Sequence, residues 1–143
     1  MPNDSSAPTT RRARLLLGDG QRAVARLADA LAQPETEFVR DAAIQRFEFS
    51  FELTWKAIQA VARLEGQDCT SPRTALSTAW RNGWLDDETA WIEMLEDRNK
   101  TSHTYRDAVA KDVFGRLAHH LPRLRQLLTA LSSRISEIEG SDG

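Results

Sequence analysis

Residues 97–106 form the densest group of chemically active side chains in this sequence. Two of them, Arg98 and His103, suit chemistry at a phosphodiester. An arginine can hold the non-bridging phosphate oxygens and stabilise the charge that grows in the transition state. A histidine can donate or accept a proton near neutral pH, so His103 is a candidate general base or acid. The run consists of Asp97, Arg98, Asn99, Lys100, Thr101, Ser102, His103, Thr104, Tyr105 and Arg106.

The spacing of these residues sets a condition on the local structure. Positions five apart lie about 140° apart on an ideal helix, so Arg98 and His103 would not share a face. If the helix unwinds after Asn99, both side chains can turn toward one groove. In an extended stretch, His103 and Tyr105 would point the same way. RNA brings its own nucleophile, the 2′-hydroxyl, so such a site needs no metal, and we expect no cofactor.

The spacing alone also permits a structural interpretation. Arg98 can pair with Asp97 or Glu96, and His103 can cap a helix end through its ring nitrogens. One arginine and one histidine five residues apart do not decide between these roles.

Length and composition limit the class of protein. A chain of 143 residues is expected to form one domain. Its formal charge of −2 points to neither a nucleic-acid nor a membrane partner. Cys69 is the only cysteine, which excludes an intramolecular disulfide and fits a reducing compartment. Neither a signal peptide nor an apolar run of the ~20 residues that a membrane span needs is evident, so we expect a cytoplasmic protein.

Hydrophobic periodicity predicts an all-α fold. Apolar residues recur at three, four and seven positions, whereas a two-residue period is missing. We expect a disordered leader at 1–9, an up-and-down bundle at 10–138 made of four longer helices and one short one, and a flexible tail at 139–143. The helices are expected at about residues 10–33, 34–64, 72–82, 87–100 and 107–138.

Particular residues support these boundaries. Ser71 and Pro72 are a strong start signal for the short helix, and Asp107 is expected to cap the last one. Pro122 should kink that last helix. Gly18 and Gly20 should make the first helix irregular near its start.

Most apolar side chains at helical spacing are assigned to the core. The aromatic stripe of the second helix is read as core packing, not as a cofactor site. The inner face of the short helix is expected to include Trp80. The stripe comprises Phe47, Phe51, Trp55 and Ile58, joined by Phe38 and Ile44.

Basic residues near the polar run have two interpretations. They can form a rim for an RNA backbone, or a solvated helix face paired with Asp107 and Asp112. His119 and His120 are adjacent and point about 100° apart, so they cannot clamp one metal and are read as surface or interface residues. The candidate rim consists of Lys100, Arg106, Arg116, Arg123 and Arg125.

Residues 98–105 resemble the signature of HEPN-domain proteins of the HepT type. That signature is an arginine, four residues, a histidine, one residue and a tyrosine, with a polar residue such as Asn99 after the arginine. Residues 47–57 resemble the second helix of the related proteins called nucleotidyltransferase substrate-binding. Ser71-Pro72-Arg73, Trp84 and the turn at 91–95 fit the same group, and the resemblance covers roughly residues 12–132.

The resemblance implies a fold, an activity and a partner. Proteins of this type are dimeric helical bundles whose two motifs face a shared cleft. Many are metal-independent ribonucleases that act as toxins, and their antitoxin is a minimal nucleotidyltransferase (MNT). By this resemblance Arg98 and His103 would be catalytic, Asn99 would support them, and Tyr105 would be the tyrosine that the MNT partner modifies with AMP.

Two other functions remain open at this stage. The chain can be a non-catalytic module that presents a substrate to a separate nucleotidyltransferase, or an orphan helical interaction protein. It does not itself carry the nucleotidyltransferase motif, because no Gly-Ser pair is followed by an Asp-x-Asp-type acidic motif.

Overall fold

The computed structural model describes residues 9–141, and all of the regular structure in that range is helical. The predicted all-α bundle is therefore confirmed. Most of the leader expected at 1–9, and positions 142 and 143 of the expected tail, lie outside the described residues. The elements are α1 (Thr10–Leu31), α2 (Glu37–Leu64), α3 (Pro72–Arg81), α4 (Glu88–Lys100), a 3-10 turn η1 (Thr101–His103) and α5 (Asp107–Ser141).

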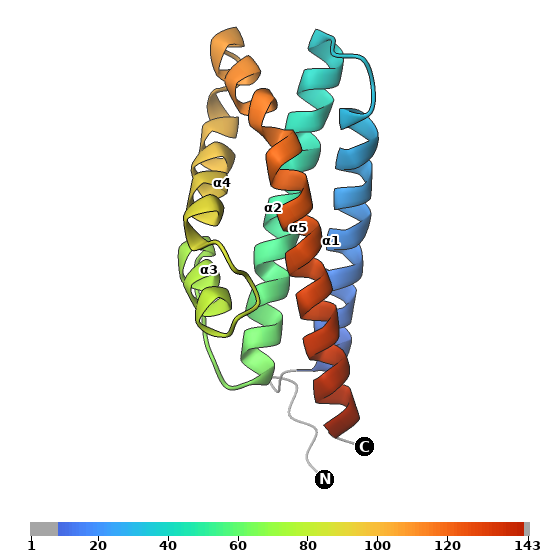
Figure 1. The fold of residues 1–143 in the computed structure, drawn as a ribbon, viewed down its shortest axis with the longest axis vertical. Helices are drawn as coiled ribbons and strands as arrows, with labels where there is room; N and C mark the ends of the chain where they lie inside the picture. Colours follow the sequence, from blue (N-terminus) through green and yellow to red (C-terminus); the bar gives the residue numbers. More distant parts are fainter. Residues whose placement is uncertain (1–8, 142–143) are drawn as a thin grey trace.

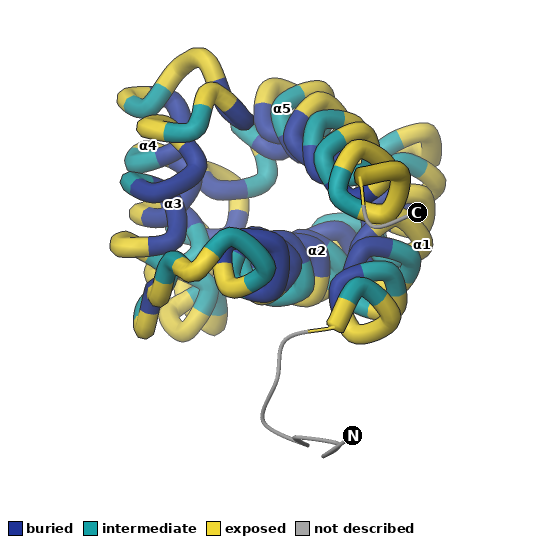
Figure 2. The backbone as a smooth tube through the Cα atoms, turned by 90° about the horizontal axis from the view of Figure 1, so that it is seen from below, coloured by how far each residue is buried: buried dark blue, intermediate teal, exposed yellow. Residues whose placement is uncertain are grey.

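The helix α2 is the centre of the bundle. It contacts α1, α3, α4, α5 and η1. The long helices α1, α2 and α5 run side by side, while α3 and α4 follow one another along the opposite side of the bundle from α1 (Figure 1). Buried residues face the interior in each helix (Figure 2). Within residues 9–141, no helix is both long and apolar enough to cross a membrane.

Short polar side chains fix where the helices begin. Ser71 and Thr74 form a reciprocal capping box at α3, as the Ser71-Pro72 pair predicts. The start of α2 lies slightly later than predicted, because the Thr36 hydroxyl accepts a hydrogen bond from the Val39 amide at 3.1 Å and so caps the helix. Asp107 is the first residue of α5 and not its cap.

The core contains most of the predicted stripe, but two of the predicted aromatic residues are exposed. Phe47 and Phe51 are fully buried, with ring centroids 6.3 Å apart. Phe38 is 83% exposed, because it lies nine residues before Phe47 and therefore on the opposite face of α2. Trp80 is 44% exposed because it lies at the edge of the buried face of α3.

Two features of α1 and α5 also differ from expectation. Helix α5 continues to Ser141, beyond the predicted end at Ile138, and Arg14 of α1 donates a 2.9 Å hydrogen bond to Glu139 in this last turn. Helix α1 is continuous through Gly18 and Gly20. The lack of a side chain at Gly20 allows α5 to approach closely. A Cβ there would lie 3.3 Å from a methyl carbon of Leu128. Pro122 lies inside α5, as predicted, and the helix changes direction along its length (Figure 1).

Candidate functional site

The polar run predicted to carry chemistry lies where α4 ends and α5 begins. Helix α4 continues one residue past Asn99 and then tightens into η1, so the segment is a compact turn and is not extended. Hydroxyl groups bind the free carbonyls of the last helical turn: Thr101 Oγ1 donates to the Arg98 carbonyl at 2.6 Å, and Ser102 Oγ donates to the Asn99 carbonyl at 3.1 Å. These bonds replace the helical ladder and fix the turn.

Arg98 is held by a residue of a different helix. Its guanidinium is ion-paired with Glu52 of α2, and both side chains are about one-third exposed. The other carboxylate oxygen of Glu52 accepts a 2.7 Å hydrogen bond from Trp55 Nε1. Arg98 also donates to Asn99 Oδ1 at 3.3 Å. Arg98 therefore pairs with neither Asp97 nor Glu96, the partners that the structural interpretation allowed, and Glu52 is a site residue that the sequence pattern missed.

His103 and Tyr105 lie together on the exposed surface of the turn. Their ring centroids are 6.2 Å apart with the planes at 68°, an edge-on arrangement. Tyr105 is 75% exposed, and the guanidinium carbon of Arg106 lies 5.7 Å from its ring centroid. The turn thus presents an imidazole and a phenol to solvent side by side.

A groove of about 480 Å³ borders Tyr105. Thr104 and Tyr105 form one wall, and the first half of α2 forms the other. The α2 wall carries the carboxylates of Asp41 and Glu48, and the uncharged residues Ala42, Ile44 and Gln45 lie between them in the sequence. Within the described part of the chain, Arg98 bonds to Glu52 and Asn99, and no hydrogen bond joins it to His103.

Behind the turn, Asp97 is the centre of a buried ionic network. It is 2% exposed, accepts two hydrogen bonds from Arg116 (Nη2 at 2.6 Å and Nε at 2.9 Å), and lies 2.7 Å from His120 Nε2. Burial by itself raises the pKa of Asp97, but the hydrogen bonds from His120 and Arg116 outweigh it and lower the pKa to about 2. The bonds from Arg116 to Asp97, together with those to Asp112, raise the pKa of Arg116. This network fixes the end of α4 against α5.

The network corrects one expectation. His120 is 5% exposed and stacks on Phe47 with centroids 5.5 Å apart, so it is a core residue and does not lie at the surface. His119, its neighbour, is exposed. The identity of two adjacent histidines does not show which one faces inward, but their spacing does. His120 lies three residues after the buried Leu117 and therefore on the same face of α5.

Three of the five cations of the candidate rim are paired with carboxylates. Arg116 points inward to Asp97 and also binds Asp112, Lys100 Nζ lies 4.0 Å from Asp97, and Arg123 lies 3.8 Å from Asp87. The alternative of a face paired with carboxylates therefore fits these three cations better. Within residues 9–141, no cluster of three or more His, Cys, Asp or Glu side chains is arranged to hold a metal ion.

Comparison with known proteins identifies the family. The model of the family described as "Nucleotidyltransferase substrate binding protein like" matches residues 16–133. This chain belongs to that family. The match covers all five helices except the outer ends of α1 and α5, and it contains both Glu52 and the turn at residues 98–105. No curated protein matches the chain.

Three solved structures share the fold. A protein from Thermus thermophilus is 37% identical with a TM-score of 0.74, over 78% of this chain and 98% of its own. A protein from Haemophilus influenzae, described as the substrate-binding domain of a nucleotidyltransferase, is 25% identical with a TM-score of 0.64, over 87% and 99%. A toxin–antitoxin structure with AMP-PNP is 14% identical with a TM-score of 0.69, over 83% and 96%, and shares the fold alone.

Proposed function

We propose that this chain is the toxin of a toxin–antitoxin pair: a metal-independent HEPN-type endoribonuclease that a cognate MNT nucleotidyltransferase silences by adding AMP to Tyr105. The observation that carries the proposal is the exposed turn after α4, where His103 and Tyr105 lie edge-on at 6.2 Å and Arg98 is held in place by Glu52. Support comes also from the family, named for nucleotidyltransferase substrate binding, and from a toxin–antitoxin protein of the same fold.

The proposed cleavage uses the ribose as nucleophile. His103 removes the proton of a 2′-hydroxyl, the 2′-oxygen attacks the adjacent phosphorus, and the bond from phosphorus to the 5′-oxygen breaks. Arg98 binds the non-bridging oxygens and stabilises their growing negative charge, with Asn99 as a further polar contact. The products are a 2′,3′-cyclic phosphate and a 5′-hydroxyl.

A homodimer completes this proposed site. One copy presents Arg98 and His103 without a hydrogen bond between them in the described residues, and a second copy facing it would bring two sets of these groups to one phosphate. In such a cleft, the protonated His103 of the second copy can give its proton to the leaving 5′-oxygen. The two copies then share the roles of general base and general acid.

Tyr105 suits the proposed control step. It is the only tyrosine in the chain and is 75% exposed. Its phenol oxygen would attack the α-phosphorus of ATP bound by the MNT partner, with pyrophosphate as the leaving group. The adduct would place a negatively charged phosphodiester and a bulky nucleoside beside His103, where an RNA phosphate would otherwise bind.

One observation favours a second candidate function. The charge of Arg98 is already neutralised by Glu52 in the described structure, which weakens its attraction for a phosphate. A non-catalytic subunit that presents a substrate to a separate nucleotidyltransferase would need no free arginine. In that function Tyr105 and the groove beside it would be the presented surface.

Cleavage of RNA separates the two functions. Purified wild-type protein should cut RNA in the presence of EDTA and leave 2′,3′-cyclic phosphate ends. His103→Ala should lose about a hundredfold or more in rate, in line with general acid–base catalysis. His119→Ala, which changes another exposed histidine, should keep the wild-type rate. If wild-type protein leaves RNA intact, the ribonuclease function is wrong and the second candidate gains support.

Modification of Tyr105 has its own test. Incubation with the cognate MNT protein, ATP and Mg²⁺ should add AMP to the wild-type chain, as measured by intact mass. Tyr105→Phe should gain no such mass. An unchanged wild-type mass, with an MNT protein shown to be active on another acceptor, contradicts the proposed control.

A further inference from the structure

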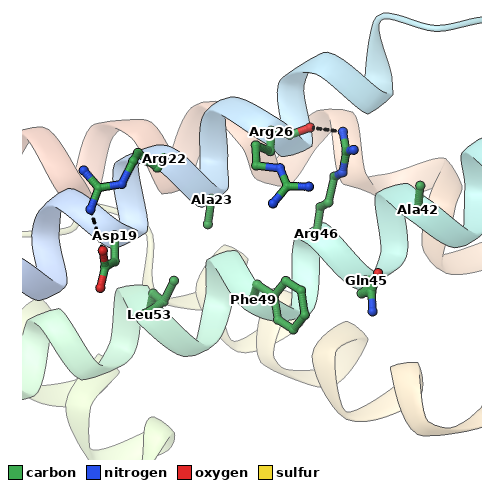
Figure 3. Close-up of a pocket in the computed structure, with 9 residues that line it drawn as sticks. All are labelled: Asp19, Arg22, Ala23, Arg26, Ala42, Gln45, Arg46, Phe49 and Leu53. Atoms are coloured by element: carbon green, nitrogen blue, oxygen red, sulfur yellow. Dashed lines mark hydrogen bonds and ion pairs between the residues drawn. The ribbon is translucent and has the colours of Figure 1, made fainter.

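A second groove, of about 470 Å³, lies between α1 and α2. Figure 3 shows the side chains that line it, with Phe49 and Leu53 of α2 on one side and Ala23 of α1 on the other. Phe49 is 52% exposed, so an aromatic face is open to solvent in the groove. An exposed phenylalanine in an apolar depression is a surface on which a flat ligand group can stack.

Arginines from both helices border this apolar surface. Arg46 of α2 donates from Nη1 to the Arg26 carbonyl at 2.8 Å, which fixes its side chain against α1. The Arg26 guanidinium extends from α1 toward Phe49 (Figure 3). Arg22 is paired with Asp19 at 2.5 Å. Among residues 9–141, neither Arg26 nor Arg46 has a carboxylate within ion-pair distance, so two positive charges remain available.

The local charge contrasts with that of the whole chain. The chain is formally −2, whereas the charged residues that line the groove are three arginines and one aspartate. A basic groove in a slightly acidic protein indicates an anionic ligand for that face, although overall charge does not.

This groove adjoins the one beside Tyr105. Ala42 and Gln45 of α2 line both of them. A ligand that follows the surface of α2 can therefore pass from the arginines to the turn that carries His103. Asp41 and Glu48 lie on either side of the shared residues in the sequence of α2. An anionic chain that passes from one groove to the other would therefore follow the uncharged Ala42 and Gln45.

We propose that the groove between α1 and α2 binds single-stranded RNA next to the site of cleavage. Arg26 and Arg46 would bind backbone phosphates and Phe49 would stack on a base. The inference rests on the proposed ribonuclease function and adds to it a place for the substrate outside the 98–105 turn. Basic side chains beside an exposed aromatic ring are how proteins bind single strands without reading their sequence.

The spacing of the charges and the exposed ring favour RNA over an acidic protein segment. The planar fork of a guanidinium binds phosphates and carboxylates alike, but regularly repeated phosphates along a strand can reach arginines on two helices while a base stacks on Phe49. An extended strand also fits an open groove that leads toward a second one. A protein partner would use the same apolar floor but would not require free charge at both Arg26 and Arg46.

Binding without cleavage tests the proposal. The probe is a fluorescent single-stranded RNA of about 12 nucleotides in which every 2′-hydroxyl is methylated, so that it cannot be cut. Arg26→Ala, Arg46→Ala and Phe49→Ala should each weaken binding about tenfold in an anisotropy titration. The double arginine variant should make the slope of log K against log salt less negative by about 1.4.

Matched variants control for general loss of charge or of an aromatic ring. Arg73→Ala removes an exposed arginine of α3, and Phe38→Ala removes an exposed phenylalanine of α2 that does not line the groove. Both should bind like wild type. All variants should be compared by thermal unfolding and by mass in solution, so that loss of binding is assigned to the groove itself.

Two results would overturn the proposal. Wild-type affinity in all three groove variants would show that RNA does not bind here. Loss of binding together with a change in oligomeric mass would show that the groove is a protein interface. Because the probe cannot be cleaved, these results are independent of whether wild-type protein cuts unmodified RNA, which tests the proposed function separately.

Discussion

The buried carboxylate of Asp97 in α4 lies 2.7 Å from Nε2 of His120 in α5. Asp97 directly precedes Arg98, so the ionic network and the candidate site share one turn of helix. Arg116 completes the network with two hydrogen bonds to the same carboxylate. The position of the functional turn therefore depends on a charged group in the interior, which is stable only while its partners are present.

Loss of the Asp97 charge should destabilise the fold. Asp97→Asn leaves the volume almost unchanged but removes the negative charge that pairs with the partly exposed Arg116 and the buried His120, so we expect a loss of about 3 kcal/mol in the free energy of unfolding. Asp112→Asn is the control, because it removes the exposed partner of the same arginine and should cost much less stability. Urea denaturation measures both. Equal losses of stability in the two variants would contradict the prediction that the buried ion pair of Asp97 contributes more than the exposed one of Asp112.

The same carboxylate should make stability depend on acid pH. Its folded-state pKa of about 2 lies below the ordinary value of 3.8, so the unfolded chain binds the proton more readily. The stabilisation, about 2 kcal/mol, is fully present above about pH 5 and is lost as pH falls from about 4 through about 2. Denaturation midpoints of wild type and Asp97→Asn should therefore converge in this range. A constant difference down to about pH 2 would contradict the assigned cause.

The fold could be predicted from the sequence because each helix carries a local signal. Capping residues and glycines marked the helix boundaries to within a few residues, and an apolar stripe marked most buried faces. Phe38 was misplaced because hydrophobicity alone does not reveal the face, whereas its spacing from Phe47 does. The end of α5 was missed because Glu139 is stabilised by Arg14, a contact between the two ends of the chain that no local pattern contains.

The candidate site could be predicted only in part, for a similar reason. The turn at 98–105 is contiguous and was found. Its supports, Glu52 and His120, come from α2 and α5 and are distant in sequence, so they were not. Glu52 directly follows the buried Phe51, and a partly buried carboxylate needs a positively charged or hydrogen-bonding partner. The sequence does not show that this partner is Arg98.

A buried hydroxyl offers a stabilising substitution. Thr54 Oγ1 is buried and has no hydrogen-bond partner in the described part of the structure. Thr54→Val keeps the shape and removes the unpaired polar atom, so it should raise the free energy of unfolding by about 1 kcal/mol. Thr78→Val is the matched control, because the buried Thr78 hydroxyl accepts a 3.3 Å hydrogen bond from Arg81 and should lose stability on substitution. Thermal unfolding of the pair measures the difference, and a loss in both variants contradicts the prediction.

Substitution of Glu52 should separate positioning from binding in the proposed ribonuclease. Glu52→Gln removes the negative charge that holds Arg98, so the freed guanidinium should attract the RNA phosphate at least as well, and KM should not rise. The arginine is then less well oriented toward the transition state, and kcat should fall about tenfold or more, since small misplacements of a catalytic group are costly. Glu137→Gln, which removes an exposed partner of Arg134, should change neither constant. Steady-state kinetics of RNA cleavage measure both values. A rise in kcat would mean that Glu52 restrains Arg98 and does not position it.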